Sequence, residues 1–275
     1  MAAEAAVRGV RAPRAPIARW LLRDQRRSHV LWGVALTAVS ALYMAFYPSM
    51  ANEDMEALMA GLPEALRVGM GWDAIATGAG YLQSTVYGLL APALLLVFAV
   101  SHGARLLAGE EEAGTLELES TGPVGRRSLL LQRLAVLGVG LVVLCAVLAA
   151  VTLVLAPALD MGIAPANILA AVLGLWLFVL AMGTVTFAVG AVTGRRATAL
   201  GVGAAIAVGS YMANAIAPMA EGAEWLETIS PFSWYAAGEP LTSGVDPLGY
   251  ALLLVLTVLA GAVAVSSFDR RDLGV

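Results

Sequence analysis

Six long apolar stretches alternate with polar segments along this chain of 275 residues, of which 60% are hydrophobic and 13% are charged. A helix needs about 20 predominantly apolar residues to cross the hydrocarbon core of a bilayer. The stretches cover about residues 30–48, 84–103, 134–156, 167–192, 197–217 and 248–267, and none of them contains Asp, Glu, Arg or Lys. The pattern predicts an all-α integral membrane protein, with six transmembrane helices in a single transmembrane domain over residues 1–275.

The segment before the first span is rich in arginine and has a helical pattern of its own. We expect residues 1–14 to be disordered and residues 15–28 to form a helix. On that helix Ile17, Trp20 and Leu21 share one face and arginines occupy the rest, which is typical of a helix lying in the headgroup plane. A simple basic flank that orients the first span is the alternative. The long basic leader and the length of the apolar run disfavour a cleaved signal peptide.

Two acidic segments precede spans 2 and 6. Residues 50–83 carry five acidic residues and one arginine, and residues 218–247 carry five acidic residues and no basic one. The first segment has methionine and leucine at helical spacing, and the second mixes aromatic and turn residues. Such patterns predict short amphipathic or interfacial helices. We expect them on the extracytoplasmic side.

The arginines gather on one side of the predicted bundle. The chain has 16 arginines and no lysine. One side, made of the N-terminus, the 104–133 loop, the 194–196 turn and the C-terminus, holds 15 arginines and nine acidic residues. The other side holds one arginine and 11 acidic residues. Because arginine and lysine concentrate in cytoplasmic loops, we expect a multi-pass protein of the plasma (inner) membrane with both termini in the cytoplasm.

Catalysis by this chain alone has little support. A phosphate-binding P-loop needs a lysine, which this chain lacks, and the sequence has no HExxH, GxSxG or CxxC motif. We expect no catalytic residue, no metal site and no cofactor in this chain. His29 and His102 lie at cytoplasmic span ends, where ordinary interfacial histidines are a better interpretation than a metal pair. Ion-coupled transporters usually keep charged residues within their spans, so their absence here also disfavours that class.

The longest cytoplasmic segment between two spans covers residues 104–133. Glu110, Glu111 and Glu112 suit the first turn of a short helix, where the helix dipole favours negative charge. Pro123 disfavours helical geometry in the residue before it, so we expect this helix to end near residues 120–123. Arg126 and Arg127 then lead into span 3. A solvated loop that only connects two spans explains these residues equally well.

The same loop resembles a signature of the permease subunits of type-2 ABC exporters. Their acidic pair, Gly-Thr-Leu-Glu run, Pro-Val-Ser-Arg run and later basic residue are matched by Glu111, Glu112, Gly114, Thr115, Leu116, Glu117, Pro123, Val124, Arg126 and Arg133. Ser230-Pro231-Phe232 after span 5 and the basic segment before span 1 agree with that family. Gly125 replaces the usual serine, which weakens the helix cap expected there.

The resemblance implies a coupling helix that seats on a separate ATP-binding subunit. It implies two copies of that subunit, which hold ATP and Mg, and a second permease chain, identical or related. The implied coupling residues are Glu110, Glu111, Glu112, Gly114, Thr115, Leu116, Glu117, Arg126 and Arg127. The implied pathway follows spans 2 and 5 at the permease dimer interface, where the polar or aromatic candidates are Tyr87, Ser210, Tyr211, Met212 and Asn214. Interhelical hydrogen bonding or packing is the alternative role for these five residues.

The expected function is therefore outward transport of an amphipathic drug, antibiotic or lipid-like substrate. The expected contacts are membrane lipid and a hydrophobic or amphipathic substrate, with no nucleic acid. An ion-coupled secondary transporter and a non-transporting membrane accessory subunit are the alternatives.

Overall fold

The computed structural model describes residues 16–50, 77–114, 125–217, 222–223 and 225–270. Regular structure in these ranges is entirely helical. Six helical segments are long and apolar enough to cross a membrane: Arg26–Met50, Gly78–Glu112, Arg126–Ala158, Pro165–Thr193, Arg196–Ile216 and Pro247–Arg270. The all-α prediction with six spans is confirmed.

Spans 3 to 6 are single helices, α10 (Arg126–Ala158), α11 (Pro165–Thr193), α12 (Arg196–Ile216) and α16 (Pro247–Arg270). Span 1 is α2 (Arg26–Ala45) followed by the short α3 (Tyr47–Met50). Span 2 is continuous but changes its winding along its length. It runs through α6 (Gly78–Leu82), the π-helix η2 (Gln83–Leu90), α7 (Ala91–Ala104), the π-helix η3 (Arg105–Gly109) and α8 (Glu110–Glu112).

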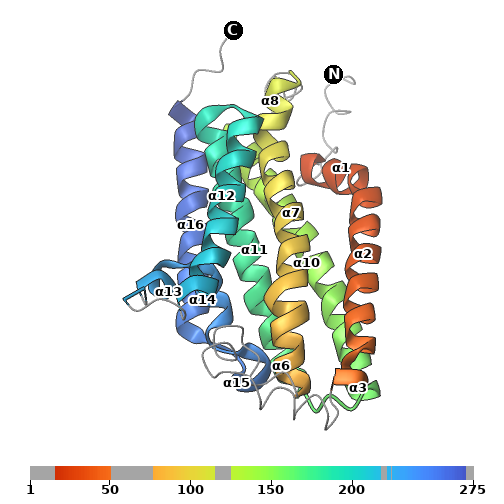
Figure 1. Cartoon of the computed structure of the whole chain (residues 1–275). Helices are drawn as coiled ribbons and strands as arrows, with labels where there is room; N and C mark the ends of the chain where they lie inside the picture. Colours follow the sequence, from red (N-terminus) through yellow and green to blue (C-terminus); the bar gives the residue numbers. More distant parts are fainter. Residues whose placement is uncertain (1–15, 51–76, 115–124, 218–221, 224, 271–275) are drawn as a thin grey trace, which may run out of the picture.

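The chain described here begins and ends on the same side of the bundle. The first residues of α1 (Pro16–Asp24), the last residues of α16 and the short α8 all lie at the upper end in Figure 1. We call this end the termini side. The short helices α3, α6 and α15 (Pro240–Ser243) lie at the other end.

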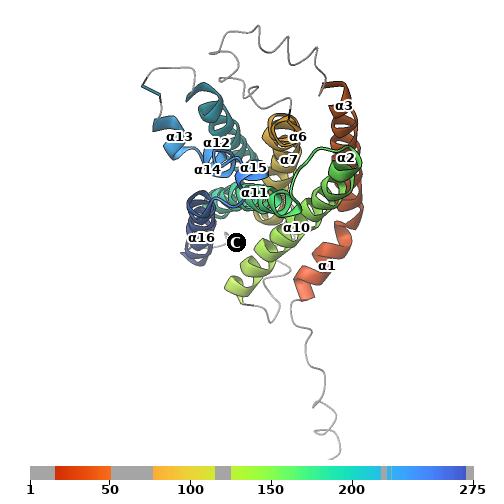
Figure 2. The ribbon, with the colours of Figure 1, turned by 90° about the horizontal axis from the view of Figure 1, so that it is seen from below.

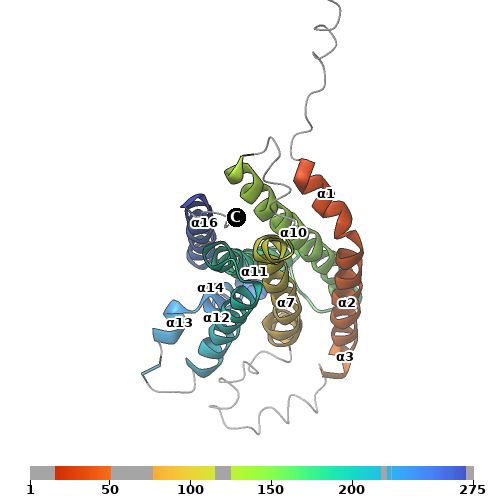
Figure 3. The same ribbon diagram turned by 90° about the horizontal axis from the view of Figure 1, so that it is seen from above.

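Helix α11 is the central element of the bundle. It packs against α16, α7, α10 and α12, which surround it when the bundle is viewed along its length (Figures 2 and 3). Its sequence is almost uniformly apolar, as expected for a helix covered on most sides. Gly194 ends the helix in the left-handed conformation, at φ +64°, which glycine adopts without steric cost.

Helices α7 and α11 cross closely at a pair of glycines. A Cβ added to Gly103 would lie 2.4 Å from the carbonyl oxygen of Gly183. We expect Gly103→Ala to lower the free energy of unfolding by about 1–3 kcal/mol, because the backbone of one helix must shift. Denaturant titration in mixed micelles measures this change. Gly261→Ala is the matched control, since a Cβ there meets no atom closer than 3.9 Å. Equal losses in both variants would contradict the prediction.

The N-terminal helix is shorter than predicted. Helix α1 ends at Asp24 and α2 already begins at Arg26, so residues 26–28 form the first turn of span 1. The two helices meet at a sharp angle (Figure 1). Leu21 is buried and the backbone N–H of Ala18 donates to Gln132 Oε1 of α10 at 3.4 Å. Part of the face expected to enter lipid therefore packs against span 3, while Trp20 is 57% exposed. The predicted disorder of residues 1–14 lies outside the described residues.

Three short helices lie between spans 5 and 6, α13 (Trp225–Ile229), α14 (Pro231–Ala236) and α15. Ser230 caps α14, its Oγ accepting from the N–H of Ser233 at 3.3 Å. Asn167 of α11 donates through Nδ2 to the carbonyl oxygens of Leu241 and Thr242 at 3.1 and 2.8 Å. These bonds hold the segment against the spans. Most of the segment predicted to form helices before span 2, residues 51–76, lies outside the described residues.

Candidate functional site

The acidic triplet ends the span-2 helix. The sequence predicts that Glu110, Glu111 and Glu112 begin a separate short helix. In the structure α8 follows η3 without a break, so the triplet lies at the end of the continuous span-2 helix. Residues 105–109 continue the helix as the π-helix η3, with Leu106 and Leu107 buried against the bundle. The chain leaves the helical conformation only at Gly114, where φ is +71°. The predicted coupling residues Thr115, Leu116 and Glu117 lie outside the described residues.

An acidic last turn opposes the helix dipole, which favours cations at that end. Arg133 of α10 compensates for Glu110. Its Nη2 lies 2.9 Å from Glu110 Oε2, and its Nη1 donates to the carbonyl oxygen of Leu106. The Arg133 side chain is fully buried. A buried charge of this kind needs both a counter-ion and hydrogen bonds. This ion pair joins the end of span 2 to span 3.

Glu112 makes a second contact between spans. Its Oε1 accepts a hydrogen bond from the backbone N–H of Arg196 at 2.8 Å. Arg196 is the first residue of α12, where unpaired N–H groups and the helix dipole favour an anion. The acidic turn is therefore joined to span 5 as well as span 3.

Two exposed ion pairs connect further elements on the termini side. Arg105 lies 3.8 Å from Asp24 at the end of α1, and Arg127 lies 2.7 Å from Asp269 of α16. Exposed pairs of this kind each contribute about 0–1 kcal/mol to stability.

Arg126 begins α10 without a side-chain cap from Gly125, which agrees with the departure from serine seen in the sequence. The predicted coupling residues Arg126 and Arg127 thus lie at the start of span 3.

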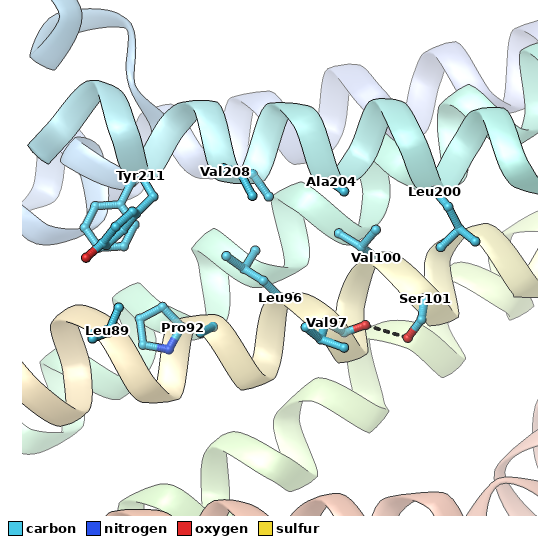
Figure 4. Close-up of a pocket in the computed structure, with 13 residues that line it drawn as sticks. Leu89, Pro92, Leu96, Val97, Val100, Ser101, Leu200, Ala204, Val208 and Tyr211 are labelled. Atoms are coloured by element: carbon cyan, nitrogen blue, oxygen red, sulfur yellow. Dashed lines mark hydrogen bonds between the residues drawn. The ribbon is translucent and has the colours of Figure 1, made fainter. Parts of the chain in front are cut away.

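A groove of about 440 Å³ lies between α7 and α12 (Figure 4). Both helices contribute apolar side chains that point toward one another, and Phe232 of α14 joins them. The lining is Leu89, Pro92, Ala93, Leu96, Val97, Val100, Ser101, Leu200, Ala204, Ala207, Val208, Tyr211 and Phe232. Tyr211 contacts Phe232 edge to face, with ring centroids 5.1 Å apart. Tyr211 is the one predicted pathway residue in this lining.

The other four predicted pathway residues lie elsewhere. Tyr87 is fully buried and its hydroxyl lies 3.0 Å from Thr152 Oγ1 of α10. Ser210 Oγ accepts from the N–H of Phe232 at 2.7 Å, and Asn214 Oδ1 accepts from the hydroxyl of Ser233 at 3.0 Å. Tyr87, Ser210 and Asn214 thus form hydrogen bonds between helices, which is the alternative role given for them above. Met212 is 42% exposed and does not line the groove.

The two histidines come together between α2 and α7, with His102 buried and His29 partly exposed at a groove between α2 and α10. The rings of His29 and His102 have centroids 6.3 Å apart, and the ring of His102 stacks on Phe98 at 3.8 Å. Each Nδ1 lies within hydrogen-bond distance of a carbonyl oxygen four residues earlier on its own helix, at 2.8 and 3.0 Å. Both rings are therefore oriented by their own helices.

The sequence reasoning missed two parts of the site. Arg133 belonged to the recognised motif but not to the expected coupling residues, although an arginine followed by an uncharged apolar run signals the need for a partner. The apolar lining of the α7/α12 groove was missed because only polar and aromatic candidates were considered. Its spacing on span 2, at Leu89, Pro92, Leu96 and Val100, is a helical stripe.

Comparison with known proteins decides the class of this chain. The sequence model of a family described as ABC-2 family transporter protein matches residues 15–273. The chain belongs to the ABC-2 transporter family. No curated protein matches the sequence significantly.

Membership of the ABC-2 family confirms the resemblance seen in the 104–133 loop. The match runs from the residue before α1 to beyond the end of α16, so it covers all six spans. An ABC-2 protein is the membrane component of an ABC transporter, is not itself catalytic and works with an ATP-binding partner. This ABC-2 protein is therefore a multi-pass membrane permease.

Proposed function

We propose that this ABC-2 permease is the membrane subunit of an ATP-driven exporter. It moves an amphipathic drug, antibiotic or lipid-like substrate outward across the plasma membrane. Two separate ATPase subunits bind ATP and Mg, and this chain holds no cofactor of its own. The observation that carries the proposal is the position of the acidic turn, which joins the end of span 2 to spans 3 and 5 and directly precedes residues 113–125 in the chain.

The contacts of the acidic turn provide a route from the loop to the spans. A partner that displaces residues 113–125 moves α8, because these residues follow α8 directly in the chain. The Glu110–Arg133 pair transfers this displacement to α10, and the Glu112 contact transfers it to α12. Since α7 and α12 form the apolar groove, separation of α8 from Arg196 widens the groove at that end. Nucleotide bound to the partner shifts the equilibrium between the narrow and the widened groove, because a ligand changes a two-state equilibrium only by binding the two states with different affinity.

The termini side is the cytoplasmic side in this proposal. Exposed arginines on this side include Arg23, Arg26, Arg27, Arg126 and Arg270. Acidic residues of the described chain at the other end include Asp160, Glu239 and Asp246. This distribution agrees with concentration of arginine in the cytoplasm.

The groove and the neighbouring face of α12 support the proposed substrate and the second permease chain. Apolar side chains line the groove, with hydroxyls only on Ser101 and Tyr211, which suits a mainly apolar substrate with few polar groups. Along α12, Gly201, Ala205 and Gly209 are exposed, and the two glycines have no neighbouring atom within 4 Å of an added Cβ. Small residues in a row allow close packing with another membrane helix.

Purification in mild detergent tests the proposal. We expect a nucleotide-binding subunit to remain bound in stoichiometric amount, and the complex to hydrolyse ATP faster when a transported amphipathic compound is added. Transport that persists after ATP depletion and collapses with the proton or sodium gradient would support a secondary transporter. A chain that purifies without an ATPase and transports nothing would fit an accessory subunit.

The loop itself gives a sharper prediction. We expect Glu111→Ala combined with Glu117→Ala to reduce substrate-stimulated ATP hydrolysis and transport by about 5- to 100-fold, the range of typical coupling free energies. Membrane insertion and expression stay normal, because the change lies in a polar segment. Reconstituted vesicles measure both activities. Glu227→Ala in α13 is the control, and unchanged transport in the double variant would refute the role of the loop.

A further inference from the structure

A second apolar groove lies between α2 and α10, away from the α7/α12 groove. It has a volume of about 580 Å³ and its apolar lining includes Val30, Val34, Val143 and Val147. Val34 is 62% exposed and Val143 is 45% exposed. Helices α2 and α10 lie side by side at the edge of the bundle in Figures 2 and 3. The groove therefore opens toward the surroundings of the spans.

One end of this groove is positively charged. Arg26 is part of the lining, and Arg23 and Arg27 are exposed beside it. Ion pairs in the described part of the chain involve Arg105, Arg127 and Arg133 instead. Asp24 is the acidic residue within this arginine group, and it lies against Arg105. Arg26 therefore places positive charge at the end of the groove nearest α1, next to an apolar lining.

The shape of the groove suits a lipid chain. Residues 26–38 of α2 line it along about 18 Å of helix, at 1.5 Å per residue. Gly33 widens the middle, since a Cβ added there meets only Val147, at 3.9 Å. A ligand that fits has an anion at one end and a hydrocarbon chain behind it. Basic pockets between membrane helices bind anionic headgroups in this way.

We propose that the α2/α10 groove binds one anionic phospholipid from the leaflet on the termini side. Arg26 contacts the headgroup phosphate, with Arg23 and Arg27 adding to the field. One acyl chain lies along Val34 and Val143. The site is separate from the α7/α12 groove, and the proposal does not depend on transport.

Native mass spectrometry of the purified full-length chain tests this site. The chain in neutral detergent is titrated with phosphatidylglycerol, phosphatidylcholine and water-soluble glycerol phosphate. We expect phosphatidylglycerol to bind at least about fivefold more tightly than phosphatidylcholine, from one arginine near the membrane surface. Glycerol phosphate alone is expected not to bind, because it cannot fill the apolar groove.

Two variants separate the headgroup from the acyl chain. Arg26→Gln is expected to weaken phosphatidylglycerol binding by about fivefold. Phosphatidylcholine binding should weaken less, because the choline cation already offsets the charge of its phosphate. Gly33→Leu fills the groove and is expected to abolish retention of both lipids. Arg270→Gln removes an exposed arginine on the same side and serves as the control, with no expected change.

Several outcomes would overturn the proposal. Equal binding of the two lipids to the wild-type chain would refute the charge selectivity, and this measurement requires no variant. An unchanged affinity in Arg26→Gln, or an equal loss in Arg270→Gln, would do the same. A second copy of this chain is the competing occupant. Oxidative cross-linking of Val34→Cys chains in nanodiscs would show that copy, because the natural Cys145 is buried.

Discussion

Replacing Arg133 with methionine is expected to lower the free energy of unfolding by about 3–5 kcal/mol. The reason is that removal of one partner of a buried ion pair leaves an uncompensated charge. Arg133 is fully buried, and it bonds both Glu110 and the carbonyl oxygen of Leu106. The variant removes this counter-ion from Glu110, at a helix end whose dipole already disfavours a carboxylate. Reversible denaturation in mixed micelles measures the loss.

A matched pair of variants distinguishes this effect from a general loss of charge. Arg127→Met breaks the ion pair with Asp269, but its side chain is 77% exposed, so we expect a change within about 1 kcal/mol. Glu110→Gln combined with Arg133→Met is expected to recover part of the loss, since no unpaired charge remains. Similar losses for Arg127→Met and Arg133→Met would contradict a special role for the buried pair.

Replacing Glu112 with alanine is expected to separate ATP hydrolysis from transport. The Glu112 carboxylate is exposed and accepts from the first N–H of α12, so its removal costs about 1 kcal/mol of stability or less. Yet it is the contact between the acidic turn and span 5. We expect substrate exported per ATP hydrolysed to fall by about 5- to 10-fold. Transport and ATPase activity are measured in the same proteoliposomes.

The conservative variant tells what Glu112 provides. Glu112→Gln keeps an oxygen that accepts the hydrogen bond but removes the charge, so we expect an intermediate ratio of transport to hydrolysis. Glu227→Gln, in α13, controls for the loss of an acidic residue outside the acidic turn. A ratio equal to wild type in Glu112→Ala would remove span 5 from the proposed route.

The spans were predictable because the bilayer imposes one simple requirement. Each apolar stretch must be long enough to cross it, and each observed helix contains its predicted span to within one residue. The exact ends were less predictable. Span 2 extends from Gly78 to Glu112, well beyond the predicted 84–103. A helix can continue past the hydrocarbon core, because its backbone groups remain hydrogen-bonded there whether the side chains are apolar or polar. The first charged residue therefore shows where an apolar run ends, but it does not show where the helix ends.

The acidic triplet shows the same limit at the candidate site. Read locally, three consecutive glutamates favour the start of a helix. The structure places them at the end of one, where Arg133 and the N-terminus of α12 offset the unfavourable dipole. Those partners are 23 and 84 residues away in sequence, and no local pattern points to them.

The amino-acid sequence by itself determined the six spans, the concentration of arginine on one side and the family motif in the 104–133 loop. These follow from composition, length and short-range spacing. Only the tertiary structure decided which carboxylate meets which helix, that Tyr211 lines the groove, and that Tyr87 and Ser210 bond within the subunit. Such choices depend on the rotation and crossing of packed helices, which are set by close contacts such as that of Gly103 with Gly183. The sequence of a helix that is apolar on nearly all sides indicates neither its rotation about its own axis nor its crossing angle with its neighbours.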